Sequence, residues 1–136
     1  MLDYEMFNPY EGLIFDMDGT LIDTMPVHAQ AWTMVGERFG YEFDCQIMYN
    51  FGGATVRTIA GEMMKAANMP LDRIEDVLAA KRELSYQLIP TQSKLLPTFE
   101  IVKSFHQKKP IALGSGSHRK IIDMLMDKLA IAPYFN

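Results

Sequence analysis

Two aspartates separated by a single residue, Asp16 and Asp18, are the side chains in this sequence best suited to chemistry. They directly follow a short apolar run, residues 13–15, which predicts a strand buried on both faces, as a parallel sheet requires. Ligands of open α/β sheets bind outside the carboxyl ends of the strands, so both carboxylates are expected at a binding edge. Gly19 comes next, and a glycine turn can leave backbone N–H groups free to face an anion.

Neighbouring carboxylates beside such a turn suit the transfer of a phosphoryl group. One carboxylate can attack phosphorus and form an aspartyl-phosphate, while the other moves protons at the leaving and attacking oxygens. Because both would repel a phosphate, a divalent cation is expected, and Mg²⁺ suits these oxygen ligands best. A simple acidic turn is the alternative, since Asp-Gly is a common turn dipeptide.

A longer string favours the phosphoryl-transfer interpretation. Residues 16–24, Asp-Met-Asp-Gly-Thr-Leu-Ile-Asp-Thr, resemble the first motif of the haloacid dehalogenase superfamily of phosphohydrolases. The continuation, Met-Pro-Val-His at 25–28 and Ala-Trp at 31–32, is similar to the subgroup containing beta-phosphoglucomutase and small sugar-phosphate phosphatases, fructose-1-phosphatase among them. The resemblance implies that Asp16 is the nucleophile and Asp18 the general acid/base. It also implies that Mg²⁺ is held by the Asp16 carboxylate and the Asp18 carbonyl, with Met17 and Gly19 in the phosphate-binding turn.

A second apolar run, residues 111–113, predicts another buried parallel strand. Gly-Ser-Gly-Ser at 114–117 and a helical pattern follow it. Small residues between a strand and a helix N-terminus favour phosphate binding, because N–H groups point outward and the helix dipole attracts anions. The resemblance places the second motif here, so that Ser115 donates to a phosphoryl oxygen with the Gly116 and Ser117 amides nearby. The alternative is a turn that caps the helix through Ser117.

The segment between the two strands is dominated by helical patterns, with no convincing strand from 26 to 89. Helices are predicted from Pro26 to Gly40, with Thr24 as a candidate cap, briefly after Asp44, over about 54–68, and from about 70 to 89. Another, capped by Thr98, follows a break at 95–97. The predicted fold class is α/β. A Rossmann-like parallel-sheet core, incomplete here, takes in 1–24 and 90–136, and an inserted α-helical cap domain takes in 25–89, as in the resembled family.

Four residues of the predicted cap are candidates for contact with the part of the substrate remote from the phosphate. His28 stands where beta-phosphoglucomutase-like chains carry a histidine, and Lys81 could reach the site from the last cap helix. Thr55 and Arg57 lie near the place of a phosphate-gripping arginine in the mutases. Thr55 aligns best with that arginine, which argues against mutase activity. A lone helical histidine such as His28 is usually a surface or half-buried residue, and a charged pair such as Lys81 and Arg82 most often lies on a solvated helix face.

Composition narrows the class of protein. Thirteen basic and seventeen acidic residues give a net charge of −4, and no basic block is present to bind nucleic acid. The apolar runs are too short for a membrane span, and the first residues lack a signal-peptide pattern. Cys45 is the only cysteine, so no internal disulfide is possible. A soluble, cytoplasmic domain without membrane or nucleic-acid partners is therefore expected.

The resembled family is longer than this chain. Its third motif supplies a lysine and its fourth supplies acidic metal ligands, and neither can follow Asn136. We therefore expect a truncated chain that is nearly inactive alone, with its open sheet edge covered by a second copy or by domain exchange. The leading function is Mg²⁺-dependent hydrolysis of a small sugar phosphate through an aspartyl-phosphate on Asp16. The alternatives are a beta-phosphoglucomutase-like phosphotransferase and a non-catalytic relic acting as a binding module.

Overall fold

The chain forms two compact units in a computed structural model that describes residues 4–136. The sheet unit comprises Met1–Met25 and Pro90–Asn136, and the helical unit comprises Pro26–Ile89. The sequence therefore leaves the sheet unit shortly after residues 16–24 and returns near Pro90.

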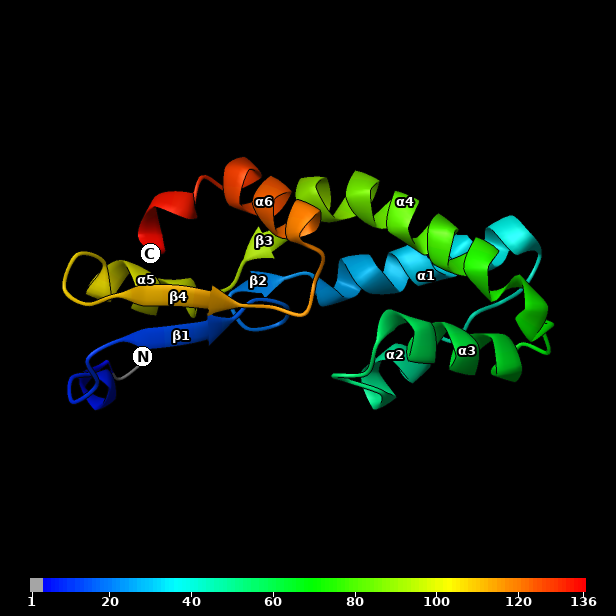
Figure 1. Cartoon of the computed structure of the whole chain (residues 1–136), viewed down its shortest axis with the longest axis horizontal. Helices are drawn as coiled ribbons and strands as arrows, with labels where there is room; N and C mark the ends of the chain where they lie inside the picture. Colours follow the sequence, from blue (N-terminus) through cyan, green and yellow to red (C-terminus); the bar gives the residue numbers. More distant parts are fainter. Residues whose placement is uncertain (1–3) are drawn as a thin grey trace. The chain divides into compact units, whose positions relative to one another are not determined.

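Two parallel strands are central to the sheet unit (Figure 1). Strand β1 (Leu13–Asp16) pairs with β4 (Ile111–Gly114), with Asp16 opposite Gly114 in the register. Both predicted strands are confirmed, each one residue longer than expected. Because the strands are parallel, their carboxyl ends meet at one edge, which is the arrangement that the sequence predicted for the site.

Burial of β1 on both faces, however, was a wrong prediction. Ile14 is 81% exposed, whereas Leu13 and Phe15 are half-buried. Successive strand side chains point to opposite faces. Among residues 4–136, no element covers the face of β1 to which the Ile14 side chain points. Only the opposite face of the strand, with Leu13 and Phe15, packs against the rest of the unit. By contrast, Ile111 in β4 is only 1% exposed.

A second, smaller sheet was not expected from the sequence. Strand β2 (Ile22–Asp23) pairs antiparallel with β3 (Lys94–Leu95), which occupies part of the predicted break. Helix α5 (Phe99–Phe105) follows as predicted. Thr98 precedes it but makes no side-chain cap; its hydroxyl donates instead to the Thr20 carbonyl and joins α5 to the turn after β1.

The remaining elements of the sheet unit are short. The single-turn 3₁₀ helix η1 (Glu5–Phe7) precedes β1, and α6 (Arg119–Lys128) and η3 (Ala132–Tyr134) follow β4. The Asn136 N–H donates to the Ile111 carbonyl at 2.8 Å, and the Asn136 side-chain oxygen accepts from the Ile111 N–H at 2.8 Å. Asn136 thus pairs with β4 on the edge that β1 does not use.

The helical unit consists of α1 (Met25–Phe39), α2 (Gln46–Asn50), α3 (Val56–Ala66), η2 (Leu71–Arg73) and the first part of α4 (Ile74–Gln92). The predicted helical ranges are confirmed, although α4 continues through Pro90 for three residues beyond the expected end. Gly40, at φ +82°, ends α1 in a conformation that favours glycine. Within this unit α1 and α4 run side by side (Figure 1).

Apolar helix faces form the interior of the helical unit. Its most buried large side chains include Trp32, Val35, Met63, Met64, Val77, Leu84 and Ile89. Two of these are methionines, which fill irregular gaps well because they are flexible. The loop after α1 approaches the helix closely, since a Cβ atom on Gly36 would lie 2.8 Å from the Tyr41 carbonyl oxygen.

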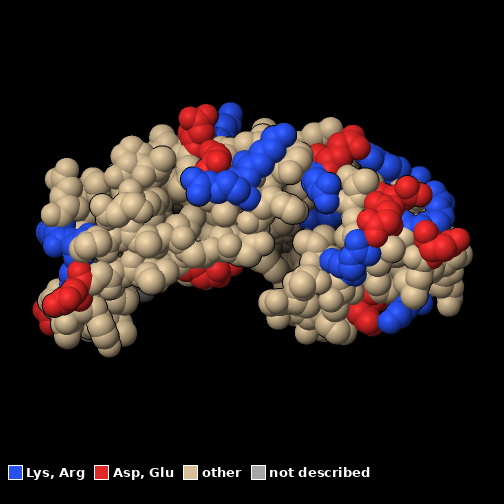
Figure 2. All heavy atoms as spheres, viewed as in Figure 1, with Lys and Arg blue, Asp and Glu red and all other residues tan. Residues whose placement is uncertain are grey.

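Charged side chains are distributed without a dominant sign. On the face shown in Figure 2, acidic and basic residues lie interspersed. Several form ion pairs within one helix, such as Lys103–Glu100 and Arg119–Asp123. Among the described residues, no helix is both long and apolar enough to cross a membrane.

Candidate active site

The Asp16 carboxylate lies exposed at the end of β1. The Thr20 hydroxyl donates to its Oδ2 at 3.3 Å. A tight turn then folds over buried Met17, whose carbonyl accepts the N–H groups of Thr20, Leu21 and Ile22 at 3.1–3.2 Å. This turn holds residues 16–22 as one compact loop at the carboxyl edge of the sheet.

Gly19 adopts a positive φ of +74°, a conformation that favours glycine. Its N–H, however, is not free to face an anion, since it donates to the Ile22 carbonyl at 2.9 Å. The reason is local, because the turn closes on itself where Asp18 and Ile22 form an isolated β-bridge. Gly19 therefore shapes the turn, and its amide makes no anion-facing contact here.

Asp18 lies half-buried among hydroxyl groups. The Thr24 hydroxyl donates to Oδ1 at 2.6 Å, and the Ser117 hydroxyl donates to Oδ2 at 2.9 Å. The Ser115 hydroxyl is also within reach of Oδ2, at 3.4 Å. Hydrogen bonds to an ionised carboxylate are among the stronger ones in proteins, so these contacts fix the orientation of the Asp18 side chain.

Ser115 and Gly116 follow β4 in the loop that leads to α6. Ser115 comes within hydrogen-bonding distance of Asp18, from which it is separated by 97 residues in sequence. The structure thus brings together Asp16, Asp18 and Ser115 as the parallel register requires. The capping alternative for Ser117 is not observed, because His118 is the N-cap of α6 and no side chain caps it.

Two residues in this cluster were missed as site residues. Thr24 was expected only as a helix cap, yet its buried hydroxyl is directed to Asp18. Ser117 was expected to offer its amide or to cap α6, yet its hydroxyl also binds Asp18. The position of these hydroxyl residues in the sequence could have indicated a role in the site. Thr24 is the last residue of the motif at 16–24, and Ser117 lies two positions after Ser115.

His28 and Lys81 meet inside the helical unit. The Lys81 side chain is only 4% exposed, and its Nζ lies 3.1 Å from His28 Nδ1. Lys81 also donates to the Ser85 hydroxyl at 2.9 Å and lies 5.0 Å from the centroid of the Trp32 ring. Lys81 is therefore a buried cation with polar partners and an aromatic face, and it does not belong to the solvated helix face that was the alternative.

Thr55 and Arg57 are engaged elsewhere in the helical unit. The Thr55 side chain is the N-cap of α3 and accepts the Thr58 N–H at 3.2 Å. The Arg57 guanidinium pairs with Glu75 at 2.6 Å, and both side chains are largely exposed. Neither arrangement resembles a side chain held ready for a phosphate.

The sheet unit offers two aspartate residues as oxygen donors for a divalent cation. Within residues 4–136, no group of three or more His, Cys, Asp or Glu side chains is placed to hold a metal. Mg²⁺, however, is commonly bound by one or two carboxylates together with waters and substrate phosphate oxygens. The exposed Asp16 carboxylate and the neighbouring Asp18 residue are oxygen donors of this kind, so the chemistry of the residues fits Mg²⁺.

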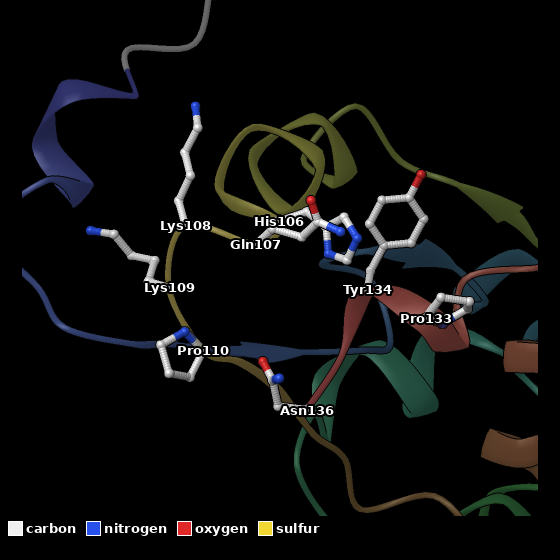
Figure 3. A pocket seen from close by; sticks show the side chains of 8 residues that line it. All are labelled: His106, Gln107, Lys108, Lys109, Pro110, Pro133, Tyr134 and Asn136. Carbon is white, nitrogen blue, oxygen red and sulfur yellow. The ribbon is translucent and has the colours of Figure 1, made fainter.

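A cavity of about 340 Å³ lies away from these residues (Figure 3). It is lined by residues 106–110 with Pro133, Tyr134 and Asn136. It therefore lies near Ile111, where β4 begins, and away from Gly114, where β4 ends. The His106 and Tyr134 rings lie 4.7 Å apart along its wall. Lys109 is directed to the N-terminal segment, where it donates to the Phe7 and Tyr10 carbonyls at 2.8 and 2.7 Å. The cavity contains none of the predicted site residues.

A carboxylate pair at the end of one parallel strand, beside a serine loop at the end of its neighbour, defines an α/β protein with its site at the carboxyl edge of the sheet. The family profile of the haloacid dehalogenase-like hydrolases matches residues 10–136. The chain therefore belongs to the haloacid dehalogenase-like hydrolase family, as the motif at 16–24 indicated.

Individual relatives agree with this membership. An uncharacterized protein of Haemophilus influenzae is 97% identical over 136 residues, which are 100% of this chain and 68% of the relative. Fructose-1-phosphate phosphatase YqaB of Escherichia coli is 34% identical over 131 residues, covering 96% of this chain and 69% of that protein. The structure of a haloacid dehalogenase-like family protein from Streptococcus pneumoniae has a TM-score of 0.81 at 17% identity, over 95% of this chain and 60% of that one. The chain thus spans about two thirds of the curated relatives and somewhat less of the solved structure.

Proposed function

We propose that this chain carries the nucleophile, the general acid/base and the phosphate loop of a phosphatase that hydrolyses a small sugar phosphate. The observation that carries the proposal is the convergence of Asp18 and Ser115 beside the exposed Asp16 carboxylate. Asp16 and Asp18 come from the end of β1 and Ser115 from the end of β4, and each has the chemistry that its step requires.

The reaction has two steps. An Asp16 carboxylate oxygen attacks phosphorus, the bond from phosphorus to the sugar oxygen breaks, and protonated Asp18 gives its proton to the leaving oxygen. Ionised Asp18 then takes a proton from water, whose oxygen attacks the aspartyl-phosphate, so that phosphate leaves and Asp16 is restored. The Ser115 hydroxyl and the Gly116 amide, in the loop that precedes α6, bind phosphoryl oxygens.

The Asp16 carboxylate and the Asp18 carbonyl are the groups that would hold Mg²⁺. When bound, the cation supplies positive charge that offsets the repulsion between Asp16 and the phosphate. Met17 and Gly19 contribute to the Mg²⁺ site indirectly, since they form the turn that joins the two aspartates to β2.

The helical unit, residues 25–89, is proposed to act as the cap domain, and residues 1–24 and 90–136 as the core. His28 and Lys81 would contact the sugar portion of the substrate, with Thr55 and Arg57 as further candidates. The name of the Escherichia coli relative makes a ketose 1-phosphate the first substrate to test. We further propose a cytoplasmic location and an association of two copies through the open sheet edge.

Phosphate release tests the proposal directly. The 136-residue chain is assayed with Mg²⁺ and fructose 1-phosphate, glucose 6-phosphate or p-nitrophenyl phosphate, beside its Haemophilus influenzae relative. We expect hydrolysis by the relative and far slower hydrolysis by the chain. The change that corresponds to Asp16→Asn, made in the relative, should abolish the relative's hydrolysis. No phosphate release by either protein from any of these esters would contradict the phosphatase assignment.

Ligand binding separates an impaired enzyme from a pure binding module. Mg²⁺ with beryllium fluoride mimics a phosphoryl group on a carboxylate and should raise the melting temperature of this chain. The increase should be lost in Asp16→Asn. An unchanged melting temperature in the wild-type chain would favour the non-catalytic alternative.

A further inference from the structure

The two serines of the loop at 114–117 differ in how they contact Asp18. The Ser117 hydroxyl lies 2.9 Å from Asp18 Oδ2, whereas the Ser115 hydroxyl lies 3.4 Å from the same oxygen. An O–H···O bond is typically 2.5–3.0 Å, so the Ser117 contact is a good hydrogen bond and the Ser115 contact is weak.

The Ser115 hydroxyl oxygen has a second function in the loop. It accepts the Ser117 N–H at 3.1 Å. A hydroxyl has one proton to donate and two lone pairs, so Ser115 can accept from Ser117 and still donate elsewhere. With only a weak acceptor in Asp18, the Ser115 proton is readily redirected to a ligand oxygen.

The other oxygen of Asp18 is held from a different part of the chain. Thr24 is fully buried, and its hydroxyl lies 2.6 Å from Asp18 Oδ1. Ser117 and Thr24 therefore hold the two carboxylate oxygens from opposite ends of the group. Rotation of the carboxylate about its last side-chain bond would break both hydrogen bonds.

We infer that Ser117 differs in role from Ser115, to which the proposed function already assigns the phosphoryl group: Ser117, together with Thr24, positions the Asp18 carboxylate. This inference rests on the proposed function. Ser117 acts through Asp18 and touches no reacting atom, so it is a positioning residue. A general acid/base must lie within hydrogen-bonding reach of the oxygen that it protonates, and a small misplacement lowers the rate by orders of magnitude.

Steady-state kinetics of the longer Haemophilus influenzae relative, with each change made at the corresponding residue, test this division. In Ser117→Ala we expect kcat to fall about 10- to 100-fold with KM within about twofold, because positioning is lost and binding is kept. In Ser115→Ala we expect KM to rise. Ser117→Thr keeps the hydroxyl and should restore kcat. Ser104→Ala removes a serine hydroxyl that bonds the Glu100 carbonyl on α5, so it is a matched control without effect. Equal changes of KM in the two loop variants would overturn the division.

A second measurement does not need turnover. The carboxyl carbons of Asp16 and Asp18 are followed by NMR as pH is varied, and both are followed because neighbouring carboxylates titrate together. A hydrogen bond to the ionised form stabilises it, so the Asp18 titration midpoint in Ser117→Ala should lie at higher pH than in the wild-type chain. Ser117→Thr and Ser104→Ala should leave it unchanged.

The two measurements fail in distinguishable ways. If the wild-type chain and its longer relative release no phosphate, the proposed function is wrong, while the titration still decides whether Ser117 holds Asp18. If Ser117→Ala lowers the melting temperature and leaves the Asp18 midpoint where it was, Ser117 is only structural and the inference is overturned.

Discussion

Asp16 and Gly114 stand opposite each other as the last paired residues of β1 and β4. The nucleophile candidate therefore faces a residue without a side chain, one position before the serine loop. A Cβ atom at Gly114 would lie 3.8 Å from Ile14 Cγ2 and 4.0 Å from the Phe15 carbonyl oxygen, which are ordinary contact distances. The glycine is consequently not required by packing at this position.

Alanine at Gly114 should be tolerated. Because the Cβ meets no close neighbour and alanine restricts the unfolded chain, we expect Gly114→Ala to leave stability unchanged or raise it by about 0.4–1 kcal/mol. The matched control is Gly36→Ala, whose Cβ would lie 2.8 Å from the Tyr41 carbonyl oxygen and should cost about 1–3 kcal/mol. Urea unfolding of both variants measures the difference. A destabilised Gly114→Ala would show that the loop needs glycine after all.

The uncovered face of β1 should make the chain associate with itself. Ile14 is an exposed β-branched residue on a strand with an open edge, and such edges favour pairing with another chain. We expect sedimentation velocity to show association that increases with concentration and weakens in Ile14→Lys. The buried neighbour gives the contrast, since Ile111→Ala should cost about 2–5 kcal/mol of stability. A monomer at all concentrations would contradict the association.

The parts of the fold that the sequence could predict have strong local signals. Residues 13–15 and 111–113 are apolar runs just before residues suited to chemistry, so both strands and the meeting of Asp18 with the serine loop could be inferred. The helical ranges between 26 and 89 were likewise visible, because apolar residues recur there at helical spacing.

Other features depend on contacts that no local pattern encodes. Strands β2 and β3 have two residues each, too few to show a period of two. The exposure of Ile14 depends on which elements cover each face of the sheet. The bond from Ser117 to Asp18 joins residues 99 positions apart, and its geometry follows from the strand register. The motifs mark the place of the site in the sequence, whereas the fold determines which hydroxyl holds which carboxylate oxygen.

The ion pair of Arg57 and Glu75 should add little to stability. Their side chains are 58% and 73% exposed, and pairs of this kind are screened by solvent. A double-mutant cycle with Arg57→Ala and Glu75→Ala should give a coupling energy below about 1 kcal/mol, reduced further by added salt. Coupling well above this value would show that the pair is a rigid structural link.

The buried cation Lys81 should contribute to folding mainly through its aliphatic stem. Replacing a buried charge by an apolar residue of similar length is often neutral or stabilising, so Lys81→Met should leave the free energy of unfolding nearly unchanged. Lys81→Ala also removes the stem that packs near Trp32 and should cost about 2–3 kcal/mol through the cavity it leaves. Ser85→Ala, which deletes one hydrogen-bonding partner of Lys81, is the control for the polar contact alone.

If urea unfolding shows Lys81→Met to be as unstable as Lys81→Ala, the ammonium group and its contacts with His28 and Ser85 hold the helical unit together. If Lys81→Met folds normally and its KM for a sugar phosphate rises, the same ammonium group serves the substrate.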